Sequence, residues 1–221
     1  MRSAFGMIEL IFAIVVIGIA MLAIPPLLMQ TTSSVEEIVK QEAIFQGYRT
    51  MGVILTYKWD DKSVVGNDNN ISHILDVTNG DSELNRTGSS SITRIGNFNN
   101  PRRVFFSSTT YASNTLGLES GESDKDDIDD FNGNTDSITA TPGEFALTFD
   151  IHQKVFYIDD NANYGASVIN LSLPVTKATA STNIKMVELN ITENNQTIII
   201  LRSFSTNIGE PKPGLLTKKV P

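Results

Sequence analysis

The chain has 221 residues, a formal net charge of -8 and no cysteine. The acidic balance argues against nucleic acid as a direct partner, because binding to a duplex requires a basic surface. Without cysteine the chain can form no disulfide bond and offers no thiol nucleophile. Its length corresponds to one globular domain of ordinary size beside an apolar N-terminal segment.

The N-terminal segment contains an apolar run that is long enough to cross a membrane. No ionisable side chain occurs from Leu10 to Met29, a run that spans roughly 30 Å as a helix and matches the core of a bilayer. The run is too long for the core of a secretory signal peptide, and Pro25 and Pro26 stand near its end in place of a small-residue cleavage motif. We therefore expect a single retained membrane-spanning helix.

Glu9 places a carboxylate at the start of this apolar run. An unpaired acid there costs a few kcal/mol in lipid, so Glu9 needs a cationic partner. No basic residue occurs between Arg2 and Lys40. A better partner is the α-amino group that cleavage just before Phe5 would create, in the same chain or on a neighbouring helix.

Residues 4–10, with the sequence AFGMIEL, resemble the processing and methylation motif of type IV pilins and type II secretion pseudopilins. The resemblance implies that a prepilin peptidase cuts between Ala4 and Phe5, that Phe5 is then N-methylated, and that the leader is residues 1–4. It also implies that Glu9 pairs with the N-terminus of a neighbouring subunit during assembly. The motif departs from the family at Ala4, where glycine is preferred, and at Gly6, where threonine is common. The resemblance covers about residues 1–60.

This resemblance implies a structural subunit, a minor pilin or pseudopilin, that requires no cofactor. Its partners would be the prepilin peptidase, other pilin or pseudopilin subunits and an inner-membrane assembly platform. The protein would cross the inner membrane once, with a cytoplasmic N-terminus and a periplasmic head, and Arg2 agrees with that orientation under the positive-inside rule. The alternative is an uncleaved anchor that holds a periplasmic binding domain and does not polymerise.

The chain is expected to continue as helix, with an interruption. Pro25 and Pro26 remove two backbone donors, so the membrane helix (residues 5–30) should kink or loosen near residues 21–26. Ser34, with an acidic residue three positions later, forms a capping-box pattern at which a second, amphipathic helix (residues 31–60) would restart. Spacings of three and four predict that its buried face is formed by Ile44, Tyr48, Met51 and Leu55, widened by Phe45, Ile54 and Trp59.

Residues 61–221 form the predicted head, which is loop-rich over 61–142 and β-rich over 143–205. The predicted strands are Phe145–Asp150, Lys154–Ile158, Val168–Leu173, Ile184–Ile191 and Thr197–Phe204. A tight connection around His152 and Gln153 would separate the first two strands, and the last two form a hairpin. A long helix followed by an antiparallel sheet places the chain in the α+β class, as the pilin resemblance also implies.

Segment 119–136 carries eight acidic side chains and one lysine. Such a run repels itself unless it is solvated or bridged by a cation, and oxygen ligands favour calcium. No register fits the EF-hand pattern, but the centre of the run resembles an acidic loop of some large minor pseudopilins, a family that uses calcium elsewhere. A solvated loop is the alternative. The candidate calcium ligands are Asp124, Asp126, Asp127, Asp129 and Asp130.

Five N-x-S/T sequons occur, and four of them carry an acidic residue two positions earlier, a pattern that bacterial oligosaccharyltransferases prefer. When used, such motifs lie on surface loops. The abundance of Asn, Ser and Thr offers a compositional explanation for the same pattern. The four candidate glycosylation sites are Asn70, Asn85, Asn190 and Asn195.

The side chains that catalysis requires are scarce. His73 and His152 are the only histidines and lie far apart in the sequence, which is insufficient for a zinc site and gives no indication of a triad. No phosphate-binding glycine loop occurs either. We therefore expect that the protein is not an enzyme.

Overall fold

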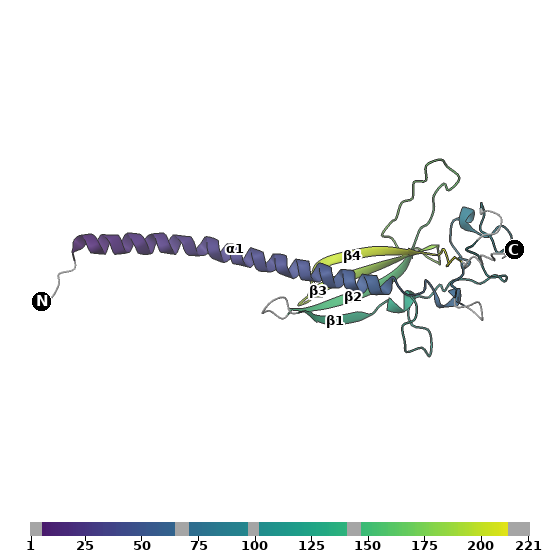
Figure 1. The fold of residues 1–221 in the computed structure, drawn as a ribbon, viewed down its shortest axis with the longest axis horizontal. Helices are drawn as coiled ribbons and strands as arrows, with labels where there is room; N and C mark the ends of the chain where they lie inside the picture. The colour runs from purple at the N-terminus through teal and green to yellow at the C-terminus, as the bar shows by residue number, and fades with distance from the viewer. Residues whose placement is uncertain (1–5, 65–70, 97–101, 141–146, 212–221) are drawn as a thin grey trace, which may run out of the picture.

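The computed structural model describes residues 6–64, 71–96, 102–140 and 147–211. One long helix, α1 (Met7–Ile54), leads into a head built on a four-stranded antiparallel sheet (Figure 1). The strands lie side by side in chain order, and the expected α+β class is confirmed. They are β1 (Thr135–Ala140), β2 (Leu147–Ile158), β3 (Ile184–Glu193) and β4 (Gln196–Thr206). The described part of the head also contains three short 3-10 helices, at Asp61–Ser63, Ser82–Leu84 and Asp129–Phe131.

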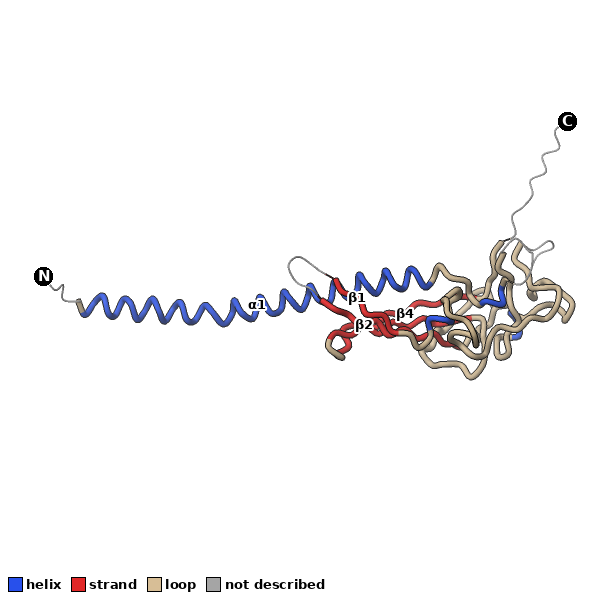
Figure 2. The backbone as a smooth tube through the Cα atoms, turned by 90° about the horizontal axis from the view of Figure 1, so that it is seen from below, coloured by secondary structure: helices blue, strands red, loops and turns tan. Residues whose placement is uncertain are grey.

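Helix α1 has two halves with different surroundings. Every described residue from Met7 to Ile38 is exposed, so roughly 50 Å of helix projects beyond the head at 1.5 Å per residue. The second half lies along one face of the sheet, and the loops gather at the opposite end of the head from the free end of α1 (Figures 1 and 2). Ala43, Met51 and Ile54 are buried there, against side chains of β2 and β3.

The face that α1 buries differs from the predicted one. Met51 and Ile54 are buried as expected, but Phe45 and Tyr48 are 63% and 68% exposed, and Leu55 also faces solvent. The predicted stripe consisted of the largest apolar side chains, whereas the helix contacts the sheet partly through residues with small side chains or none. The residues that meet the sheet include two small ones, Ala43 and Gly47.

Gly47 sets the distance between α1 and the sheet. A Cβ atom at this position would lie 2.5 Å from the terminal methyl carbons of Ile191 and Leu201. Such a separation is far below van der Waals contact, so the two side chains occupy the space that any larger residue would need. Close approach selects small residues over large apolar ones.

The predicted interruption of the helix is not present. Helix α1 runs through Pro25 and Pro26 and past Ser34 without a break, and Figure 1 shows no sharp bend there. The hydroxyl groups that suggested a new N-terminus instead donate to carbonyls one turn earlier, as Ser34 does to Gln30 at 2.9 Å and Thr32 to Leu28 at 2.9 Å. Such back-bonding lets Ser and Thr remain inside a helix.

The sheet confirms the last predicted hairpin and corrects the others. Strands β3 and β4 pair through a two-residue turn, Asn194 and Asn195, whose positive φ angles of 50° and 63° are those of a type I′ turn. Strand β2 is continuous, so the prediction of a tight connection at His152 and Gln153 is wrong. Segment 168–173 forms no strand, and β1 was not predicted.

The loop-rich part of the head is held by buried polar side chains in place of strands. Arg86 donates to both carboxylate oxygens of Asp76, at 2.7 and 2.5 Å, and to the carbonyl of Phe106 at 3.2 Å. The Asn207 side chain both donates to and accepts from the backbone of Leu75, at 2.7 and 3.0 Å. These bonds satisfy backbone groups that a sheet would otherwise pair.

Replacing Gly47 by leucine is expected to destabilise the head by about 1–3 kcal/mol, because the new side chain overpacks the helix–sheet contact. The matched control is Gly52→Leu, which has open space at its Cβ position and gains up to about 1 kcal/mol of helix propensity. Urea unfolding of the full chain in detergent micelles, followed by Trp59 fluorescence, measures both. Equal stability of the two variants would contradict the close packing at Gly47.

Candidate functional site

The exposed half of α1 presents a long apolar surface. Its most apolar stretch has a mean hydropathy of 2.8, and none of it is buried against the head. By length and composition α1 is able to cross a membrane, and it is the only such helix in residues 6–64, 71–96, 102–140 and 147–211. A large exposed apolar surface marks a membrane or protein contact.

Glu9 lies in the first turn of this helix. The backbone N–H of Gly6 donates to its Oε2 atom at 3.2 Å, and the negative charge is favourable near the positive end of the helix dipole. Within the described part of the chain, no lysine or arginine forms an ion pair with Glu9. Ala4 and Phe5, the predicted processing residues, lie outside the described residues.

A fully buried ammonium group lies beside the chain that follows the C-terminal end of α1. The Nζ atom of Lys185, on β3, donates to the carbonyl of Trp59 at 2.5 Å and to Oδ1 of Asp129 at 2.9 Å. Asp60 Oδ2 lies 3.5 Å away, and the Trp59 ring centroid lies 4.3 Å away. Two carboxylates, a carbonyl and an aromatic face therefore replace the water that this cation loses.

The five predicted calcium ligands do not converge on one point. Asp126 pairs with Lys58 at 3.0 Å, and Asp129 pairs with Lys185. Asp127 is buried and accepts backbone N–H groups, including that of Asp61 at 2.6 Å. Three of the five therefore hold the segment to the end of α1 and to β3.

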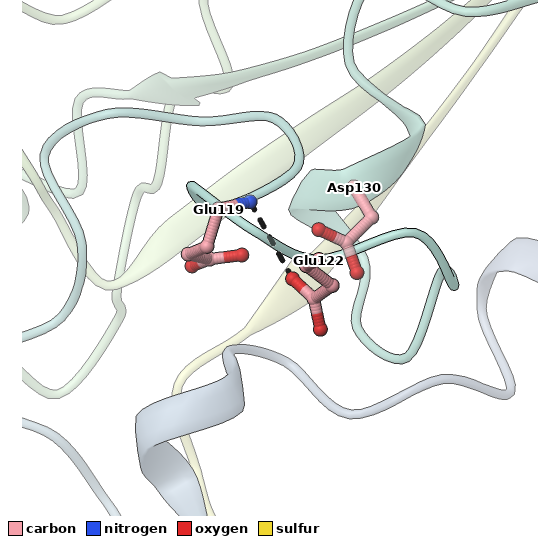
Figure 3. A group of neighbouring side chains, drawn as sticks. All are labelled: Glu119, Glu122 and Asp130. Carbon is pink, nitrogen blue, oxygen red and sulfur yellow. Dashed lines mark hydrogen bonds between the residues drawn. The ribbon is translucent and has the colours of Figure 1, made fainter.

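A different group of three acids comes together, and it contains only Asp130 of the predicted set. One carboxylate oxygen from each of Glu119, Glu122 and Asp130 lies within 4.8 Å of the others (Figure 3). Glu119 is exposed, Glu122 is half-buried and Asp130 is buried. Partial desolvation and contact with Glu122 raise the pKa of Glu119 to about 7, and the negative charges of Asp129 and Asp130 act in the same direction.

The candidate glycosylation sites fall in different environments. Asn85 and Asn195 are exposed, outside the strands, as a sequon requires. Asn190 lies within the central strand β3, and its Oδ1 atom is buried, which differs from the expected surface loop. Asn70 lies outside the described residues. Glycosylation stays a prediction at Asn70, Asn85 and Asn195.

No protein-family model, curated protein or solved structure matches this chain.

The burial of Lys185 has a signal in the sequence, although Lys185 was not among the predicted site residues. In Ile184–Glu193, the residues at 185, 187, 189 and 191 share the face that packs under α1, so a lysine at 185 points into the core. A buried lysine requires acidic partners. The partners themselves, Asp60 and Asp129, could not be read from spacing because they lie far away in the sequence.

Replacing Lys185 by methionine is expected to destabilise the full chain by about 3–5 kcal/mol, because Asp60 and Asp129 remain buried without a counter-charge. Lys154→Met is the matched control, since its side chain is 62% exposed and reaches Glu188 only at 3.7 Å. That change should cost less than about 1 kcal/mol. Denaturant unfolding in micelles compares them, and a K185M protein as stable as K154M would show that the buried pair is dispensable.

Proposed function

We propose that this chain is a structural subunit, a minor pilin or pseudopilin, of a type IV pilus or type II secretion filament. In this proposal α1 holds the precursor in the inner membrane with the head in the periplasm. A prepilin peptidase cuts between Ala4 and Phe5, Phe5 is methylated, and an assembly platform packs the helix among those of other subunits. The observation that carries the proposal is the long, exposed and apolar half of α1 with one carboxylate, Glu9, in its first turn.

The position of Glu9 supports pairing with a terminal ammonium group. Its carboxylate already lies 3.2 Å from the backbone nitrogen of Gly6, one residue after the proposed new N-terminus. A carboxylate at the edge of a hydrocarbon core is stable only when paired or hydrated. Pairing between subunits would penalise every misaligned position of one helix along another, so Glu9 would set their axial register.

The outer face of the second half of α1 supports a helix that is covered by neighbours. Phe45 and Tyr48 project away from the sheet and are largely exposed, on the same helix as the apolar run. Lipid would cover residues 10–29 but not these two aromatic side chains, which lie beside the head. Neighbouring subunits packed along the whole of α1 would cover both regions.

The same features also support a monomer that is tethered to the membrane. Cleavage of the N-terminus distinguishes the two functions, because only the filament subunit is expected to be cleaved. If the proposal holds, mature protein isolated from its native host begins at N-methylated Phe5. Mass spectrometry of the intact protein and of its N-terminal peptide measures this directly. A mature chain that retains Met1 would favour the uncleaved membrane-tethered binding domain.

Replacing Glu9 by alanine is expected to leave insertion and cleavage intact and to lower incorporation into filaments more than about tenfold, the factor that corresponds to 1.4 kcal/mol. The matched control is Glu36→Ala, which removes an exposed acid of the same helix outside the apolar run. Immunoblots of the membrane fraction and of sheared filaments give the two readouts. Normal incorporation of the E9A protein would remove the role assigned to Glu9.

A further inference from the structure

A tight turn brings two of the three clustered carboxylates together. The backbone N–H of Glu122 donates to the carbonyl of Glu119 at 3.1 Å, and Gly121 has a φ of 97°. A glycine with positive φ at the third position is the signature of a type II turn. The turn also places the N–H of Glu119 3.4 Å from a carboxylate oxygen of Glu122, so both acids lie beside the same short piece of chain.

The third carboxylate is buried and only half satisfied. Oδ2 of Asp130 accepts the backbone N–H groups of Asp126 and Asp127, at 2.9 and 3.1 Å. Its Oδ1 atom is buried and has no hydrogen-bond partner. Figure 3 shows the Asp130 carboxylate directed toward Glu122 and Glu119. A buried oxygen without a donor is destabilising, more so when charged, and a bound cation would remove that cost.

The nearby cations are engaged elsewhere. Lys58 pairs with Asp61 and Asp126, and Lys185 pairs with Asp60 and Asp129. The ammonium group of Lys125 lies 4.8 Å from the ring centroid of Phe131. Among the ion pairs of the described residues, none neutralises Glu119, Glu122 or Asp130. The group therefore carries negative charge that the protein does not balance.

We propose that Glu119, Glu122 and Asp130 form a binding site for one calcium ion. Two oxygens bound to the same calcium ion lie at most about twice its 2.3–2.6 Å bond length apart, and the three carboxylate oxygens already meet that limit, within 4.8 Å of one another. All ligands are hard oxygens without histidine or thiolate, which favours calcium over zinc. The exposure of Glu119 leaves room for the water ligands that complete a shell of six to eight.

The ion would join the turn at Gly121 to the 3-10 helix Asp129–Phe131. That helix carries Asp129, which holds the buried Lys185, so calcium would stabilise the region where the chain that follows α1 meets β3. Binding of the ion to the folded protein alone raises the unfolding temperature by mass action. The site is separate from α1 and from Glu9, so its failure would leave the proposed filament role as it stands.

Calorimetric titration of the metal-stripped full chain in detergent micelles with calcium chloride tests the site. We expect saturable binding of about one ion per chain and a higher unfolding temperature with calcium than without it. Glu122→Gln should weaken binding at least about tenfold, because it removes one charged ligand. Asp124→Asn is the matched control: it makes the same charge change in the same acidic segment, outside the group, and should bind within about threefold of the native protein.

Glu119→Gln, at an exposed position, provides a second variant in case Glu122→Gln alters folding, and far-UV circular dichroism of the metal-free proteins shows whether it does. Weakened binding by E119Q, with D124N unaffected, would support the site. Three results would each overturn it: no saturable binding by the native chain, native-like binding by both glutamine variants, or equal weakening by D124N.

Discussion

The buried ammonium group of Lys185 is the point at which the long helix, the sheet and the acidic segment meet. Removing a lysine from water costs several kcal/mol, so it can be retained only where fixed oxygens replace the water. Trp59 and Asp60 provide these oxygens from the chain that follows α1, and Asp129 provides one from the acidic segment. Since the partners come from two separate parts of the chain, the position of α1 on the sheet and the path of the acidic segment depend on one another.

The two halves of α1 obey different packing rules because they have different surroundings. The second half approaches β3 and β4 closely, and a residue larger than Gly47 would displace the terminal methyl groups of Ile191 and Leu201. The apolar stretch of the first half is not buried against the head. Its side chains are therefore suited to contact lipid or other helices. Lipid offers no hydrogen bonds, and the carbonyls that Pro25 and Pro26 leave without a backbone donor would remain unsatisfied unless a neighbouring helix or a nearby hydroxyl supplies one.

The sequence predicted the structure correctly where a single physical requirement determines it. It was misleading where the same residues fit two different structures. The apolar run and the Asn194–Asn195 hairpin follow from hydropathy and turn chemistry, and both are present. Strand β2 was divided at His152 and Gln153 because two adjacent polar residues suggested a turn. In the structure they occupy opposite faces: Gln153 is buried and donates to Asp136 at 2.6 Å, while His152 lies between hydroxyl groups on the outer face.

The loop-rich region resisted prediction for a different reason. Its backbone is ordered by individual side chains, such as Arg86 on Asp76 and Asn207 on the backbone of Leu75, whose partners are 10 and 132 residues away. No periodic pattern encodes such pairs. The prediction of the buried face of α1 was wrong for a related reason, since the tight fit at Gly47 depends on side chains of β3 and β4.

The composition of the acidic segment indicates that it could bind a cation, but it does not identify which carboxylates would do so. In the sequence its carboxylates are equivalent, and the five predicted ligands are the acids at the centre of the run. In the folded chain they are sorted by what they contact: Asp127 holds backbone N–H groups, and Asp126 and Asp129 hold lysines. Asp129 and Asp130 each retain a buried oxygen without a donor, but Asp129 is paired with Lys185, whereas Asp130 faces two glutamates from a turn that precedes the predicted set. Unbalanced charge, and not the density of acids, therefore identifies the place where this head would gain from a cation.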